Sequence, residues 1–76
     1  MRLIDEGNAI EDEGRIADAL QRYDAAVRLA PGLVRAHLNR GNMLLAMGDP
    51  ESALRAYSRA LEKDPDHAGA HYNMGN

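Results

Sequence analysis

Asparagine side chains that recur at a fixed interval are the residues of this chain best suited to recognition chemistry. Asn39 and Asn73 lie 34 positions apart, and Asn8, Asn42 and Asn76 form a second series with the same spacing. An amide side chain offers a hydrogen-bond donor and an acceptor together, so it can hold a peptide group of any sequence. The asparagine amides are therefore candidates for recognition by hydrogen bonds, and they are not groups that break covalent bonds.

Histidine and serine residues do not complete a metal or catalytic site. His67 and His71 have the spacing at which two imidazoles on one helix can share a metal ion, but the chain has no cysteine and no third ligand at a matching position. His71 also has a counterpart 34 positions earlier, His37, which favours a packing role. Ser52 and Ser58 lack a histidine–acid relay, and the glycines form no phosphate-binding loop. We expect no catalytic residues, no metal, no cofactor and no enzyme activity.

Composition and charge exclude further classes of protein. The 76 residues allow one small domain, and 12 acidic against 9 basic residues give a net charge of −3. Nucleic acid is then a poor partner, because phosphate binding needs a concentrated positive face. No apolar run approaches the roughly 18 residues of a membrane-spanning helix. The N-terminus turns acidic too early for a signal peptide. We expect a cytoplasmic protein that binds neither nucleic acid nor membranes.

The recurring residues belong to a repeat of 34 residues. Of the 42 residue pairs that lie 34 positions apart, 13 are identical. Gly7, Gly41 and Gly75 mark three copies of one unit, and the third copy is short. Residues 1–76 are therefore predicted to form a single repeat domain, divided into 1–33, 34–67 and a truncated unit at 68–76.

Each unit has the apolar spacing of two helices. The predicted helices lie near residues 1–13, 16–30, 34–47, 50–63 and 67–76. The short connections between them make neighbouring helices antiparallel. Gly14 and Gly48 stand where a helix end needs a left-handed residue. Asp49 is expected to cap the helix that begins at Pro50.

Three further pairs of residues predict how the helices pack against one another and where they begin. Gly7 and Gly41 fall inside helices, where each glycine costs about 1 kcal/mol relative to alanine, so their recurrence predicts a packing reason. Tyr23 and Tyr57 are expected in the core with their phenols reaching a surface partner. After the prolines that end the second helix of each unit, Gly32 or Asp66 is expected to cap the next helix.

The pattern of glycine, alanine, tyrosine, alanine and proline in each unit resembles the tetratricopeptide repeat family over the whole chain. The matching residues are Gly7, Ala19, Tyr23, Ala26 and Pro31, then Gly41, Ala53, Tyr57, Ala60 and Pro65, and then Gly75. The resemblance implies an all-α fold, an α-solenoid of antiparallel helix pairs coiled into a right-handed superhelix. The family's large aromatic is replaced here by Leu3, His37 and His71, and its leucine before the glycine by Glu6, Arg40 and Met74.

The same resemblance implies a protein–protein interaction module. A peptide or partner protein would lie in a concave groove lined by the first helix of each unit. The residues placed on this groove are Asp5, Asn8, Asp12, Arg35, Leu38, Asn39, Asn42, Tyr72, Asn73 and Asn76. For Asn8, Asn42 and Asn76, a polar position on a solvated helix face is an equally good interpretation. Glu11 to Glu13 either favour basic peptides or are simply solvated.

The segments around Asn39 and Asn73 resemble repeats of the O-linked N-acetylglucosamine transferase superhelix. In that superhelix a ladder of asparagines hydrogen-bonds the backbone of a bound peptide. Asp5 stands at the same repeat position in the first unit, and an ionised carboxylate accepts but cannot donate. The ladder is therefore expected to be interrupted at its first position.

Two alternatives remain open. The chain could be a substrate-selecting fragment of a larger protein, such as a bacterial glycosyltransferase. It could also self-assemble into a homo-oligomer through its C-terminal helix, because the third unit has a first helix and no second one. The face that carries Tyr72 would then be left without a covering helix.

Overall fold

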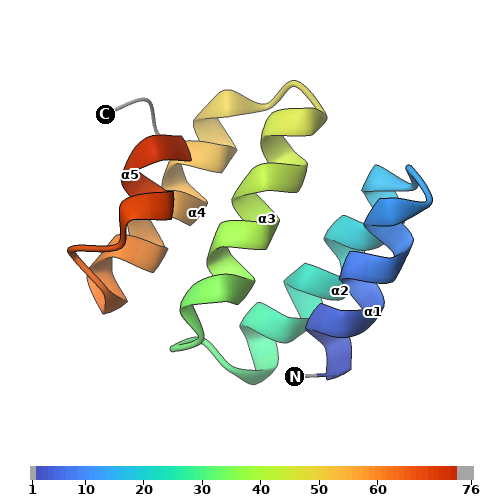
Figure 1. The fold of residues 1–76 in the computed structure, drawn as a ribbon, viewed down its shortest axis with the longest axis horizontal. Helices are drawn as coiled ribbons and strands as arrows, with labels where there is room; N and C mark the ends of the chain where they lie inside the picture. The colour runs from blue at the N-terminus through green and yellow to red at the C-terminus, as the bar shows by residue number, and fades with distance from the viewer. Residues whose placement is uncertain (1, 74–76) are drawn as a thin grey trace.

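Five α-helices make up the computed structural model of the chain, which describes residues 2–73 (Figure 1). They are α1 (Arg2–Asp12), α2 (Ile16–Leu29), α3 (Val34–Ala46), α4 (Pro50–Lys63) and α5 (Ala68–Asn73). This described part contains no strand, which confirms the all-α prediction. The helix predicted over 67–76 begins one residue later, and residues 74–76, with Asn76 among them, lie outside the described residues.

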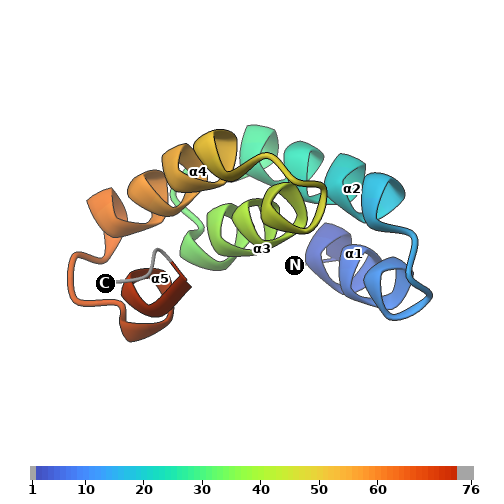
Figure 2. The same cartoon turned by 90° about the horizontal axis from the view of Figure 1, so that it is seen from above.

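The helices form two layers that follow an arch. In Figure 2, α2 and α4 run along the outer side of the arch, and α1, α3 and α5 lie along its inner side. We call these three the inner-layer helices. Helix α1 packs on α2, α2 on α3, α3 on α4 and α4 on α5, so each helix contacts its neighbours in the sequence. This arrangement is the α-solenoid that the resemblance to the tetratricopeptide repeat implied.

Helix ends were predicted correctly where the local sequence decides them. Gly14 and Gly48 have φ angles of 80° and 81°, the left-handed conformation that glycine adopts without strain. Asp49 caps α4, because its side chain accepts a hydrogen bond from the Ser52 amide at 3.2 Å. Pro50 then occupies the first turn, where its missing N–H is not needed.

The two caps expected after the prolines were wrong. The residue before α3 is Leu33 instead of Gly32, and its side chain makes no capping bond. Before α5, His67 takes the role assigned to Asp66, because its Nδ1 accepts a hydrogen bond from the Ala70 amide at 3.2 Å. An imidazole nitrogen that carries no proton can accept such a bond, but histidine is not among the residues usually expected at this position.

A tyrosine ring packed on a glycine holds each helix pair together. Tyr23 and Tyr57 are 0% and 1% exposed. The Tyr23 ring lies over Gly7, and a Cβ atom at Gly41 would stand 2.6 Å from Cε1 of Tyr57, far inside van der Waals contact. This close approach is the packing reason that the recurring helical glycines predicted.

Polar side chains join consecutive units where the family pattern has apolar ones. His37 Nε2 donates to the carbonyl oxygen of Pro31 at 2.7 Å, and His71 Nε2 donates to that of Pro65 at 2.8 Å. Arg40 on α3 forms an ion pair with Asp24 on α2. The turn between units is thus fixed by hydrogen bonds and not by a large aromatic side chain.

We expect Gly41→Ala to destabilise the fold although alanine is the better helix former. The buried Tyr57 ring would have to move, at a cost of about 3 kcal/mol, against about 1 kcal/mol gained in helix propensity. Urea denaturation should show a net loss of about 2 kcal/mol. Gly32→Ala is the matched control, because nothing lies within 4 Å of its Cβ position. Equal stability of the two variants would contradict the close contact.

Candidate functional site

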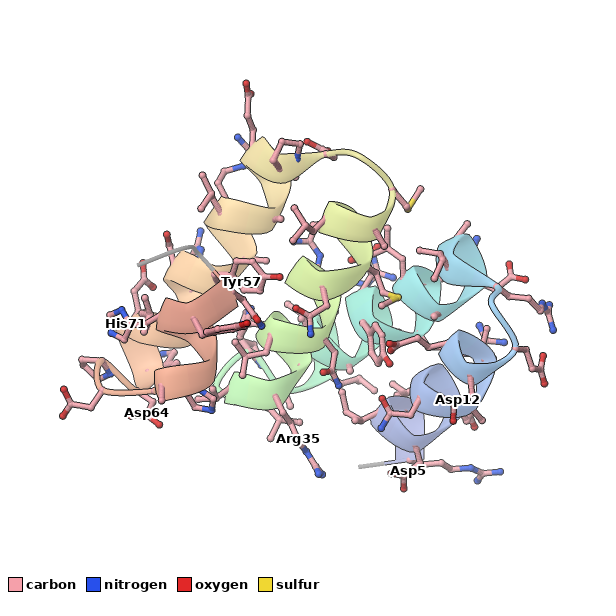
Figure 3. The ribbon with its side chains drawn as sticks, turned by 45° about the horizontal axis from the view of Figure 1, so that its top comes forward. Asp5, Asp12, Arg35, Tyr57, Asp64 and His71 are labelled. Atoms are coloured by element: carbon pink, nitrogen blue, oxygen red, sulfur yellow. The ribbon has the colours of Figure 1, made fainter. Side chains whose placement is uncertain are left out.

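The predicted groove residues lie on the inner-layer helices but differ in exposure. Figure 3 shows Asp5 and Arg35 projecting away from the ribbon near the starts of α1 and α3. The exposed members of the set are Asp5, Asn8, Asp12, Arg35 and Tyr72, and the half-buried ones are Asn39, Asn42 and Asn73. Leu38 is only 9% exposed and packs in the core with Tyr57, so a partner cannot reach its side chain as the groove prediction requires.

The buried tyrosines reach the asparagines of the inner layer. The Tyr57 hydroxyl donates to Asn42 Oδ1 at 2.6 Å. The Tyr23 hydroxyl lies 2.7 Å from Asn8 Oδ1 and 2.8 Å from Glu11 Oε1, which share its single proton. The expectation that each phenol finds a surface partner is confirmed. Asn8 and Asn42 are therefore neither purely ligand residues nor merely solvated, because both satisfy a buried hydroxyl.

A second bond to Asn42 connects two inner-layer helices. Asn73 Nδ2 on α5 donates to Asn42 Oδ1 on α3 at 3.0 Å. The Asn42 oxygen thus accepts two hydrogen bonds, which fixes the direction of its own NH2 group. Asn39 is half-buried and, among residues 2–73, takes part in neither of these bonds.

Sequence reasoning did not foresee the roles of two residues at one repeat position. Glu11 accepts from Tyr23, whereas its counterpart 34 residues later, Leu45, is 47% exposed. Glu13 pairs with Arg15 at 3.3 Å. Two members of the acidic run thus have partners within the chain. The sequence did contain a signal for this difference, because Glu11 of the first unit is replaced by Leu45 in the second.

The environment of the phenols shifts their ionisation. Burial raises the pKa of Tyr23, and the hydrogen bond with Glu11 raises this pKa further, because a tyrosinate would face a carboxylate. Burial also raises the pKa of Tyr57. Both hydroxyls therefore remain donors to the inner-layer side chains well into the alkaline range.

The two histidines considered for metal binding have other partners. His67 Nδ1 accepts from the Ala70 amide, and His71 Nε2 donates to Pro65. Within residues 2–73 no group of three or more histidine, cysteine, aspartate or glutamate side chains is placed to hold a metal ion. No helix in the same part of the chain is long and apolar enough to cross a membrane.

A pocket of about 330 Å³ lies away from the predicted groove residues. Its lining residues come from α2, α3, α4 and the turn between α2 and α3: Val27, Pro31, His37, Arg40, Arg59, Glu62 and Lys63. None of the predicted groove residues lines it. We take as the candidate site the surface of the inner-layer helices that carries the predicted groove residues, and not this pocket.

Comparisons with known families agree with the repeat found in the sequence. A model described as a tetratricopeptide repeat matches residues 34–67. A second model, described as a TPR repeat, matches residues 7–48, which is more than half of the chain. Among curated proteins the chain has no significant match.

We expect the free energy of unfolding to fall as pH rises above 10, the ordinary pKa of tyrosine. The raised folded pKa values of Tyr23 and Tyr57 mean that the unfolded state loses its phenol protons first. The stability that the two tyrosines contribute is fully present below the tyrosine pKa of the unfolded chain. It is lost as pH rises through the higher tyrosine pKa of the folded chain. Urea denaturation from neutral pH to about 11 should show this loss. The Tyr23→Phe, Tyr57→Phe double variant should show a smaller alkaline slope, and an unchanged slope would refute the assignment.

Proposed function

Because the chain belongs to the tetratricopeptide repeat family, we propose that it is an interaction module that binds an extended peptide along its inner-layer helices. Tetratricopeptide repeats generally mediate protein–protein interactions and are typically non-catalytic, which makes a protein or peptide the expected partner. The family does not specify which surface binds. The choice of surface rests on the amides of α3 and α5.

Asn42 is the observation that carries this proposal. Its oxygen is occupied by Tyr57 and Asn73, so its NH2 group is held in one orientation by the fold. A donor that is already oriented loses little conformational freedom on binding a peptide carbonyl. Asn39, on the same helix, adds an amide with both a donor and an acceptor. Together they match the alternating N–H and C=O groups of an extended chain.

An apolar contact beside these amides sets a preference for the ligand. Leu45 follows Asn42 by three residues on α3, so the two share one side of the helix, and the leucine is 47% exposed. Arg35, Asp5 and Asp12 place charges of both signs on the surrounding inner-layer surface. The best ligand is thus an extended segment with an apolar side chain close to the backbone groups that the asparagines hold.

The resemblance to the O-linked N-acetylglucosamine transferase superhelix suggests an alternative function for the same surface. The Asn39 and Asn73 spacing also suits a substrate-selecting fragment of a larger protein, such as a bacterial glycosyltransferase, in which the same amides hold the acceptor polypeptide. Asp5 interrupts the ladder in the first unit, so the ladder of amides is limited to α3 and α5.

A chain without cysteine suits the reducing cytoplasm, which is the location we propose.

Replacing Asn39 by aspartate tests the inner-layer site. The change keeps the shape of the side chain and removes its donor, so the affinity of the best ligand from an extended-peptide library should fall about tenfold, or 1.4 kcal/mol. Chemical-shift titration of the folded chain would measure it. The control is Gln21→Glu, the same amide-to-acid change at an exposed position of α2. Shifts confined to α2 and α4, or an unchanged affinity for Asn39→Asp, would reject the site.

A further inference from the structure

The pocket of about 330 Å³ belongs to α2, α3 and α4 and is separate from the surface proposed to bind an extended peptide. Val27 comes from α2, whereas Arg59 and Lys63 come from α4. Figure 2 shows α2 and α4 on the outer side of the arch. All the lining residues fall between positions 27 and 63, within the first two units. Pockets that hold small groups measure roughly 300–1,000 Å³, so this one can take a side chain.

Positive charge gathers in this pocket although the chain as a whole has a net charge of −3. Arg40, Arg59 and Lys63 line it, with Glu62 as the single lining carboxylate. Asp24, which does not line the pocket, forms the ion pair with Arg40. Three cations against two carboxylates leave one positive charge in excess, with histidine counted as neutral.

The two cations of α4 are specific to the second unit. The counterparts of Arg59 and Lys63 in the first unit are Ala25 and Leu29, which carry no charge. Cations in the last turn of a helix offset the partial negative charge of its end, and this alone would explain Lys63. It does not explain why a cation from another helix, α3, lines the same pocket.

The fold holds that third cation, Arg40, in a fixed position. Its Nε donates to Asp24, and among residues 2–73 its guanidinium makes no other hydrogen bond. Arginine has five N–H donors, so the four on its terminal nitrogens remain for a ligand. Two terminal nitrogens can meet both oxygens of one carboxylate. Because the ion pair already orients the side chain, little conformational freedom is lost on binding.

Arg59 and Lys63 are open to an external anion. The shortest distance between Arg59 and Glu62 is 4.0 Å, and their side chains are 70% and 61% exposed. So exposed a pair, at so long a distance, neutralises the arginine only weakly. Lys63 forms no ion pair within the part of the chain that the structure describes.

An apolar wall stands beside these charges. Val27 is half-buried, and the carbonyl of Pro31 accepts a hydrogen bond from His37 Nε2 at 2.7 Å. His37 is itself only 6% exposed, so the bond fixes the proline at the edge of the pocket. The pocket therefore suits a ligand in which an apolar group lies next to the negative charge.

We propose that this pocket binds a carboxylate side chain from an acidic peptide segment of a partner protein, with a neighbouring apolar side chain on Val27 and Pro31. One positive charge in excess matches a carboxylate, whereas a phosphorylated residue carries nearly two negative charges. Neither Asn39 nor Asn42 lines the pocket, so the proposal does not rest on the inner-layer site. One chain can then hold two polypeptide segments at once, on opposite sides of the arch.

Chemical-shift titration with the blocked peptide Leu-Glu-Glu-Leu tests the ligand class. At low ionic strength the peptide should shift backbone amides within residues 27–31, 37–40 and 59–63, with a dissociation constant of about 1 mM. The peptide Leu-Gln-Gln-Leu should bind about tenfold more weakly, because it lacks the charge. Equal binding of the two peptides, or shifts confined to α1 and α5, would overturn the proposal. Inorganic phosphate that shifts the same amides at lower concentration than the peptide would overturn the carboxylate assignment.

Removing the exposed cations tests the pocket itself. The Arg59→Gln, Lys63→Gln double variant should bind the acidic peptide about tenfold more weakly, a loss of 1.4 kcal/mol. The matched control is the Arg2→Gln, Arg55→Gln double variant, which loses the same charge at two exposed positions outside the pocket and should bind like the parent chain. An equal loss in both variants would mean attraction by overall charge and would overturn the pocket.

The two binding proposals fail separately. The Arg59→Gln, Lys63→Gln variant should keep the affinity of the parent chain for the extended peptide of the inner layer. Asn39→Asp should likewise leave binding of Leu-Glu-Glu-Leu unchanged. Loss of Leu-Glu-Glu-Leu binding in Asn39→Asp would place the acidic peptide on the inner layer and overturn the proposal for the pocket.

Discussion

The contact between each buried tyrosine ring and a helical glycine sets the geometry on which the other interactions depend. At Gly7 and Gly41 the missing side chain lets the ring lie against the helix backbone. Only from that position does the phenol reach the inner layer, where its hydroxyl donates a hydrogen bond to Asn8 or Asn42. The core of each helix pair and the polar surface proposed to bind peptide are therefore coupled through one side chain. A change that moves the ring also releases the asparagine.

Polar residues at the family's apolar positions turn out to have specific partners. His37 bonds a proline carbonyl, and Arg40 pairs with Asp24. The side chains of Arg40 and Asp24 are 34% and 35% exposed, so solvent screening limits the pair to about 1 kcal/mol or less. Such bonds contribute less stability than a packed aromatic ring, but they tie one helix pair to the next at a fixed register.

Periodicity was sufficient to predict the helices, the left-handed glycines and the buried tyrosines, because these depend on local backbone preferences and on which face of a helix is buried. It also indicated that the helical glycines have a packing reason, but not that a tyrosine ring lies on each of Gly7 and Gly41. It was not sufficient for the polar contacts. Asn42 finds its partners on α4 and α5, and no spacing within α3 reveals them. His67 took a capping role that propensity assigns to Asp66, and Leu38 turned inward. Peptide binding by Asn39 remains a proposal, because only a bound ligand would reveal a hydrogen bond to its amide.

The short sequence span of these contacts has a kinetic consequence. Among the described residues, the side-chain hydrogen bonds link positions no more than 31 apart, and those of the two buried phenols span 15 or fewer. A chain that closes only small loops loses little entropy before its contacts form. Each hairpin can assemble in any order and recruit its neighbour, as in a one-dimensional lattice. Rapid folding without a long-range nucleus follows from an architecture in which distant parts of the chain never have to meet.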